Sequence, residues 1–241
     1  MGAQGAGKVV MVMVADFPET ADIETSSDDY ASRFAGAVGE WFLQVQGEGT
    51  LRLLSDYPGA RILDVGGGHG QIAGLLARHG YDVTVQGSAE VCGPRLAPLV
   101  QPGQVRFDVP NTLDLPYPDR AFDVVISYRL LPHVERWRVF VAELARVARH
   151  AVVVDYPEVR SANAVAPLLF PVKKQMEGNT RTYTTFRRAE LVEAFGEHGL
   201  EYGGRFPEFF FPMVLHRRLQ QPAISAALEG ASRALGLTGF L

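Results

Sequence analysis

Short apolar runs alternate with segments of helical periodicity through the middle of the chain. The apolar runs predict strands at 61–65, 82–86, 104–108, 122–127 and 151–156. The segments between them predict helices at 71–79, 89–100 and 136–149. Strands that are apolar on both sides suit a parallel sheet covered by helices on both faces. The pattern therefore predicts an α/β fold with a doubly wound, mostly parallel sheet.

The two ends of the chain depart from this alternation. Residues 1–26 show no clear pattern and are expected to be a flexible terminus, whereas helical spacing at 28–46 and 50–55 predicts a helical cap over 27–58. Beyond the fifth strand, helices are expected near 161–177, at 188–198 and at 222–235. Apolar runs at 200–206 and 209–217 flank Pro207 and Glu208 and predict a C-terminal antiparallel β-hairpin. With this hairpin the sheet is seven-stranded, and residues 27–241 form a single domain with a substrate-side insertion at 157–187.

Composition narrows the class of protein and of partner. With 47% hydrophobic and 21% charged residues among 241, the chain has the make-up of a globular domain with ample material for a core. A net charge of −4 argues against nucleic-acid binding, which needs a concentrated basic face. The single cysteine, Cys92, excludes an internal disulfide, and no apolar stretch reaches the roughly 20 residues of a membrane span. We expect a cytoplasmic protein with a small-molecule partner and with no nucleic-acid or membrane partner; its oligomeric state stays open.

The junction between the first strand and the following helix carries the strongest functional signal. The strand ends near Asp64 and runs into four glycines between positions 66 and 70, and a helical pattern begins at Ile72. Glycines adopt positive φ, and without a Cβ they let a ligand approach the main chain. A strand, a bare turn and a helix start form an arrangement that binds nucleotide-like ligands. The alternative is a glycine-rich connection without a ligand.

This turn resembles the first motif of the class I S-adenosylmethionine (SAM)-dependent methyltransferases, hydrophobic-Leu-Asp-x-Gly-x-Gly-x-Gly. Leu63, Asp64, Gly66, Gly68 and Gly70 fill that motif without a gap. The resemblance implies a Rossmann-like fold in which Asp64 and these glycines hold the amino-acid end of SAM. The turn also fits the looser G-x-G-x-x-A fingerprint of dinucleotide-binding proteins, so by itself it leaves a nicotinamide cofactor open.

A second segment favours the methyltransferase family. Residues 115–125, Leu-Pro-Tyr-Pro-Asp-Arg-Ala-Phe-Asp-Val-Val, resemble the family's stretch leading into its fourth strand, which dehydrogenases do not usually carry. Five βα steps followed by a hairpin also match the topology that the resemblance implies. Together these features favour SAM over a nicotinamide cofactor.

One contact expected from the resemblance is altered at the second strand. Family members usually end that strand with an acidic residue that accepts both ribose hydroxyls. Here the position falls on Gly87, flanked by Gln86 and Ser88, and Glu90 follows in the first turn of the next helix. Losing a hydrogen bond to a charged group costs about 1.5–3 kcal/mol. A weakened or repurposed SAM site is therefore a second hypothesis.

The resemblance also assigns residues after the other strands and on the N-terminal helix. Asn111 replaces the aspartate that contacts the adenine amino group and keeps an acceptor oxygen, with Thr112 beside it. Tyr30, on the first predicted helix, lies where family members often touch the methionine end of SAM. Ser127, at the end of the fourth strand, completes the candidate cofactor-binding residues.

Residues for the reaction itself are sought in the loops beyond the carboxyl ends of the strands. His133 is the best candidate for a general base because imidazole titrates near neutral pH, and it equally suits a structural histidine behind the cofactor. His69, inside the glycine turn, is expected to point to solvent. The histidines show no metal-ligand spacing, so no metal is predicted.

We therefore expect a SAM-dependent methyltransferase that modifies a small, apolar or aromatic acceptor at oxygen, nitrogen or carbon. The alternative is a protein of the same fold with an altered or vestigial SAM site, acting as a non-methylating catalyst or an interaction module. Neither the acceptor nor the methylated atom follows from the sequence, because substrate pockets vary within one fold.

Overall fold

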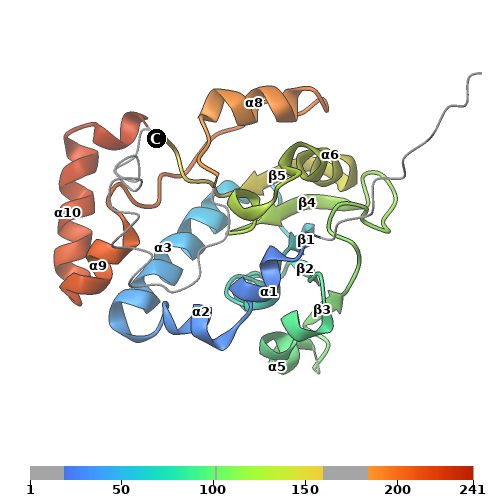
Figure 1. Cartoon of the computed structure of the whole chain (residues 1–241), viewed down its shortest axis with the longest axis horizontal. Coiled ribbons are helices and arrows are strands. Elements are labelled where there is room, and N and C mark those ends of the chain that lie inside the picture. The colour runs from blue at the N-terminus through green and yellow to red at the C-terminus, as the bar shows by residue number, and fades with distance from the viewer. Residues whose placement is uncertain (1–18, 101, 160–183, 241) are drawn as a thin grey trace, which may run out of the picture.

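The computed structural model describes residues 19–100, 102–159 and 184–240. In this part of the chain, five parallel strands form one sheet in the order β3-β2-β1-β4-β5. The strands are β1 (Arg61–Val65), β2 (Asp82–Gln86), β3 (Val105–Asp108), β4 (Phe122–Ser127) and β5 (Ala148–Val154). Figure 1 shows them in the centre of the molecule with helices around them. The predicted parallel sheet is confirmed.

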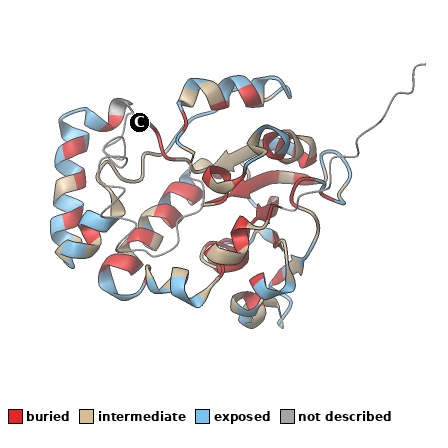
Figure 2. Cartoon of the chain, viewed as in Figure 1, coloured by how far each residue is buried: buried red, intermediate tan, exposed pale blue. Residues whose placement is uncertain are grey.

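Helices cover both faces of the sheet. Because successive side chains of a strand point to opposite faces, each strand contributes residues to an apolar core on either side. In β1, Ile62 and Leu63 belong to two different apolar cores, and neither is exposed. Leu63 shares its core with side chains of α6 (Trp137–Val147) and α8 (Arg188–Gly196). Ile62 shares the other core with side chains of α4 (Ala73–Arg78) and with Leu54 at the end of α3 (Gly36–Leu53). The buried residues in Figure 2 concentrate accordingly in the sheet and on the inner sides of these helices.

The helix predicted at 89–100 is broken into three short pieces. They are the 3-10 helices η2 (Glu90–Cys92) and η3 (Pro94–Leu96), followed by α5 (Ala97–Val100). Gly93 and Pro94 explain the break, since proline lacks the amide hydrogen and clashes with the preceding turn of a helix. Further 3-10 helices are η1 (Gly67–His69) after β1, η4 (Leu131–His133) after β4 and η6 (Leu237–Phe240) near the end.

The N-terminal part is more ordered than the sequence predicts. Helix α1 (Ala21–Thr25) falls inside the segment 1–26 that we expected to be flexible, and Ala21 and Asp22 are only 3% and 1% exposed. The predicted helix 28–46 is divided into α2 (Asp28–Ser32) and α3, which begins at Gly36 with a φ of +73°. Helix α3 also includes most of the segment 50–55. Residues 19–26 are thus held by long-range contacts that periodicity does not reveal.

The C-terminal part differs most from the prediction. The antiparallel hairpin at 200–206 and 209–217 is wrong: the chain has no regular structure over 200–212, and α9 (Met213–Leu219) follows. The described residues therefore contain a five-stranded sheet instead of a seven-stranded one. Phe209 packs its ring against Trp41 and Phe42 of α3, which explains the apolar run without a strand. The helix predicted at 161–177 and most of the insertion at 157–187 lie outside the described residues.

A buried polar pair fixes this C-terminal layer. Glu229 of α10 (Pro222–Ala234) has Oε1 2.8 Å from His216 Nε2, and its carboxylate accepts the amide hydrogens of Phe210 and Phe211 at 2.8 and 3.0 Å. Burial alone would raise the pKa of Glu229, but these bonds outweigh it and the pKa is lowered. His216 and Glu229 are 0% and 1% exposed. The pair joins α9, α10 and the segment before them into one unit against α3.

Candidate functional site

The turn after β1 has the bare main chain that the sequence predicts. Gly66 and Gly70 adopt φ angles of +78° and +69°, in the left-handed region that favours glycine. A Cβ on Gly66 would lie 2.6 Å from Leu130 Cδ2, and one on Gly67 would lie 2.1 Å from Asp64 Oδ2. Because carbon atoms in contact stay about 3.5–4.0 Å apart, any larger residue at 66 must displace its neighbour.

Asp64, at the end of β1, is a buried carboxylate. Its side chain is 0% exposed, and neither oxygen has a hydrogen-bond partner in the described part of the chain. Burial raises the pKa of Asp64 to about 7, although the Arg129 guanidinium acts in the opposite direction. An unpaired buried carboxylate is costly, and a cationic ligand group offsets that cost. The turn and Asp64 together therefore favour a ligand that brings a positive charge to the main chain at 66–70.

The second strand ends at Gln86, as the predicted strand 82–86 does, and the predicted Gly87 follows directly. The Gln86 side chain is 0% exposed, and its Nε2 donates to Pro110 O and to Thr112 Oγ1, both at 3.2 Å. Its Oε1 has no partner among the described residues. Sequence reasoning named Gln86 only as a residue flanking Gly87, because its burial and its hydrogen bonds to residues after β3 depend on contacts distant in sequence. The structure thus adds a buried acceptor next to the predicted Gly87 and Ser88.

Asn111 and Thr112 follow β3, and the hydrogen bond to Gln86 links Thr112 to the tip of β2. Thr112 is 1% exposed. Asn111 Oδ1 accepts the amide hydrogen of Leu113 at 3.0 Å, which is an Asx turn. The structure therefore brings the residues predicted from β2 and β3 to one edge of the sheet, with the Asn111 oxygen already serving the turn.

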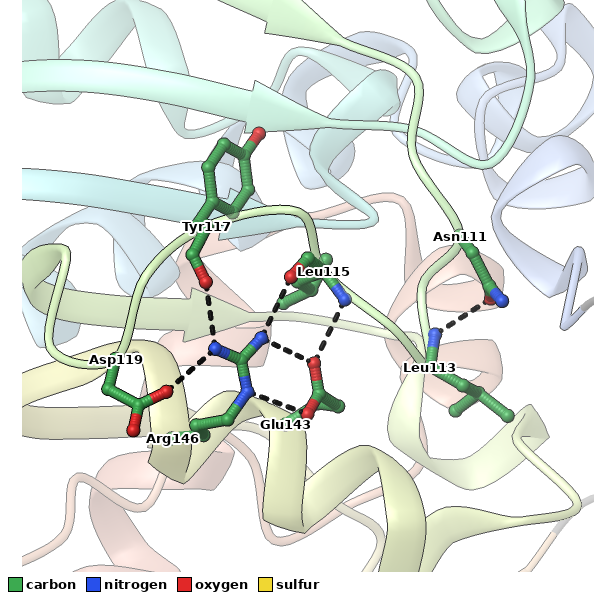
Figure 3. Close-up of polar contacts among 7 residues, drawn as sticks. All are labelled: Asn111, Leu113, Leu115, Tyr117, Asp119, Glu143 and Arg146. Carbon is green, nitrogen blue, oxygen red and sulfur yellow. Dashed lines mark hydrogen bonds and ion pairs between the residues drawn. The ribbon is translucent and has the colours of Figure 1, made fainter.

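Two charged side chains of α6, Arg146 and Glu143, hold the segment 115–125 in place. Figure 3 shows Arg146 of α6 pointing into the loop before β4. Arg146 donates to Tyr117 O at 2.7 Å and to Leu115 O at 2.8 Å, while Glu143 accepts the Leu115 amide hydrogen at 2.9 Å. The hydrogen bond from Arg146 is the main cause that holds the pKa of Glu143 below its usual range. The segment 115–125, which resembles the family's stretch before its fourth strand, is therefore attached to α6 through its main chain at Leu115 and Tyr117.

Arg129, just beyond β4, collects polar side chains from several elements. It has a φ of +61°, and its amide donates to Asp155 Oδ1 at 2.6 Å. The guanidinium donates to Gln46 Oε1 at 2.8 Å and to Gln71 Oε1, and it lies 4.3 Å from the ring centroid of Phe34. Burial raises the pKa of Asp155. Arg129 is thereby held rigidly where the ends of β4 and β5 meet.

A crevice runs along this cluster. Its lining includes Tyr30, Arg129, His133, Asp155, Tyr156 and Glu208. Burial, with a contribution from the charge of Asp155, raises the pKa of Glu208 to about 7. Sequence reasoning missed Glu208 as a site residue, because it was placed between two strands of the expected hairpin. The structure places the predicted Tyr30 and His133 on this crevice.

Ser127 and His69 are both buried. Ser127 Oγ is buried and donates to Val65 O at 2.9 Å, so this hydroxyl ties β4 to β1. The expectation that His69 points to solvent is wrong: it is 4% exposed, and its Nδ1 accepts the Gln71 amide hydrogen at 3.3 Å. Burial lowers the pKa of His69 to about 3, so the ring is neutral. Within the described residues no three His, Cys, Asp or Glu side chains gather as a metal-ligand set.

Helix α1 and the residue after it cover the glycine turn. A Cβ on Gly68 would lie 2.5 Å from Ser26 Oγ, so this serine packs directly on the turn. Asp22 accepts hydrogen bonds from the Ser88 amide at 2.6 Å and from the Ser88 hydroxyl at 2.5 Å. Glu19 accepts the Arg136 amide hydrogen at 3.0 Å. A ligand at the turn must therefore share its surroundings with residues 19–26.

Comparison with known proteins supplies an independent view of this site. A family model described as "Methyltransferase domain" matches residues 63–153, which include the turn and the ends of β2, β3 and β4. O-methyltransferase rstn1 of Aspergillus nomiae is 30% identical over 155 residues, covering 55% of this chain and 68% of that protein. O-methyltransferase resE of Aspergillus sclerotiorum is 30% identical over 154 residues, covering 55% of this chain and 58% of its own length. The chain therefore spans less than two thirds of resE.

The fold has counterparts among solved structures. Magnesium protoporphyrin IX methyltransferase of Synechocystis, solved with bound S-adenosylhomocysteine (SAH), has a TM-score of 0.56 at 18% identity. The match covers 72% of this chain and 84% of that one. At this identity the likeness concerns the fold. No helix in the described residues is long and apolar enough to cross a membrane.

Proposed function

This chain belongs to the class I SAM-dependent methyltransferase family, and we propose that it transfers the methyl group of SAM to a small acceptor molecule. The observation that carries the proposal is the buried Asp64 carboxylate, which has no hydrogen-bond partner among the described residues and faces a turn of bare main chain. Two relatives named O-methyltransferases support an oxygen atom as the acceptor.

The residues present fit the cofactor of this family. Asp64 offers a negative charge for the amino group of SAM, and the glycines at 66–70 leave the main chain accessible. Gln86 Oε1 offers an acceptor at the tip of β2, beside Asn111 and Thr112 at the tip of β3. Bound SAM supplies an activated methyl group that is transferred by direct displacement.

Residues along the crevice orient the methionine end and the acceptor. Arg129 presents a fixed positive charge that suits the carboxylate of the methionine end. Tyr30 lies close enough to Arg129 for its phenol and the guanidinium to interact electrostatically. The acceptor enters the crevice past Tyr156 and Phe206, whose rings favour an apolar or aromatic molecule. Positioning of this kind supplies much of the rate enhancement in a displacement reaction.

His133 is the proposed general base. It is half-buried at the end of η4 and, like Arg129, lines the crevice. A ring nitrogen of His133 accepts the proton that a hydroxyl acceptor loses on methylation, a role that contributes about 10²–10⁴ in rate.

A second candidate function rests on the position of α1. Because Ser26 packs on Gly68 and Asp22 bonds to Ser88, the surroundings of the turn are filled by the chain itself. This favours, as the alternative, a protein of the same fold whose SAM site is vestigial and which acts as a non-methylating catalyst or an interaction module.

Calorimetric titration with SAM and SAH separates the two candidates. We expect saturable one-site binding by the wild type and a strong loss of affinity in Gly66→Ala, whose Cβ meets Leu130. Gly80→Ala is the matched control, because Gly80 also has a positive φ, +83°, but nothing lies within 4 Å of its Cβ position. Absence of heat with millimolar SAH would remove the enzyme proposal. A screen of hydroxylated aromatic compounds for methyl-dependent mass gain then identifies the acceptor.

A further inference from the structure

The segment that covers the glycine turn carries a carboxylate to the tip of the second strand. Asp22 belongs to α1, yet its side chain reaches the loop after β2, which is 66 residues further along the chain. There it accepts the amide and the hydroxyl hydrogens of Ser88 at 2.6 and 2.5 Å, and the Cys92 thiol lies 3.4 Å away. Asp22 is 1% exposed, so its position is fixed by packing.

The tip of β2 is where a doubly wound fold binds a ribose. In nucleotide-binding βαβ units the first turn holds the polar part of the ligand, and a carboxylate near the end of the second strand accepts the ribose hydroxyls. In this chain that strand ends in a neutral residue, Gln86, which presents a single acceptor oxygen without a partner among the described residues. Glu90, the acidic residue nearest in sequence, is exposed.

We propose that Asp22 is the carboxylate that accepts hydrogen bonds from the ribose hydroxyls of SAM, with Gln86 Oε1 as a second acceptor. Asp22 now accepts hydrogen bonds from three donors in the part of the chain that the structure describes, and two of them, the amide and the hydroxyl of Ser88, are close together like the two hydroxyls of a ribose. A carboxylate has about four acceptor positions, so Asp22 can keep the Ser88 amide while the Ser88 hydroxyl gives way. The residue missing from the strand is thus supplied by α1, which covers the site as it binds. This inference rests on the proposed function.

The test compares SAH with its 2′,3′-dideoxy analogue on the wild type and on Asp22→Asn. The wild type is expected to bind SAH, and Asp22→Asn to bind it about ten- to hundredfold more weakly, as for loss of a hydrogen bond to a charged group. The analogue is expected to bind much more weakly than SAH to the wild type but only slightly more weakly to Asp22→Asn. Asp28→Asn is the matched control, since it removes the ion pair of Asp28 in α2 with Arg95 in η3 and leaves the contacts of Asp22 with Ser88 in place.

The outcomes separate the inference from the function on which it rests. Equal or tighter SAH binding by Asp22→Asn overturns the inference and makes α1 a plug that the cofactor displaces. Failure of the wild type to bind SAH overturns the proposed function as well. A crystal structure of the wild type with SAH is a second readout that needs no variant. We expect a ribose hydroxyl within hydrogen-bond distance of Asp22, and ribose contacts made by Gln86 alone contradict the assignment.

Discussion

Replacing Asp64 by asparagine is expected to stabilise the ligand-free protein at high pH and to remove its affinity for SAM. The ionised Asp64 carboxylate is buried with no hydrogen-bond partner among the described residues, and the charge of Arg129 only partly offsets the cost of burial in the folded state. The same charge is the group that we assign to the amino group of the cofactor. The substitution therefore separates the effect of the Asp64 charge on the stability of the fold from its effect on the affinity for SAM.

The magnitude follows from the pKa of Asp64, which burial raises from 3.8 to about 7. Because the folded state holds the proton more tightly than the unfolded state, the stabilisation is fully present below pH 3.8 and is lost as the pH rises through about 7. Asparagine has no such proton. Relative to the wild type, the free energy of unfolding of Asp64→Asn should rise by about 2.5 kcal/mol between about pH 5 and about pH 8.

The assay is urea unfolding of both proteins at several pH values in this range, with Asp56→Asn as an exposed control that should follow the wild type. Calorimetry at the same pH values should show that wild-type affinity for SAH increases as Asp64 ionises, by up to about tenfold per pH unit below pH 7. If the free energies of unfolding of the wild type and Asp64→Asn change in parallel with pH, the reasoning is refuted. The pKa of Asp64 would then not be raised in the folded protein.

Three further substitutions test the packing and the reaction. Arg146→Leu should destabilise the protein by about 2–4 kcal/mol in urea unfolding, since two carbonyl groups and Glu143 lose a charged partner. An unchanged midpoint would mean that these hydrogen bonds do not hold the segment in solution. Glu229→Gln should lower the free energy of unfolding by about 1–3 kcal/mol and increase hydrogen exchange in α9 and α10. Exchange in these two helices that equals that of the wild type would contradict the role of Glu229 in holding them. His133→Ala should lose at least about tenfold in turnover while SAH affinity is kept, and unchanged turnover would assign His133 to structure.

The sheet and the glycine turn were predictable because their signals are local. A short apolar run such as 122–127 favours a buried inner strand, and glycines such as Gly66 and Gly70 adopt positive φ readily. Helical segments between β1 and β2, between β2 and β3, and between β4 and β5 favour parallel pairing of those neighbours. Residues at the ends of these strands were therefore found before their contacts were known.

The features that the sequence did not reveal depend on contacts distant along the chain. The aromatic run at 209–211 was assigned to a strand, but its burial comes from packing on Trp41 and Phe42 and from amide bonds to Glu229. Asp22 gave no signal because its partner, Ser88, is far away in sequence. His69 is buried under covering residues that were expected to be flexible, so its exposure was misjudged.

Hydrogen exchange of the backbone amides between 64 and 71, measured with and without saturating SAH, tests most directly whether the bare turn holds the amino-acid end of the cofactor. We predict that SAH slows exchange in this stretch more than elsewhere and that Asp64→Asn removes the effect. Protection confined to other parts of the chain, with unchanged exchange at 66–70, would contradict the account.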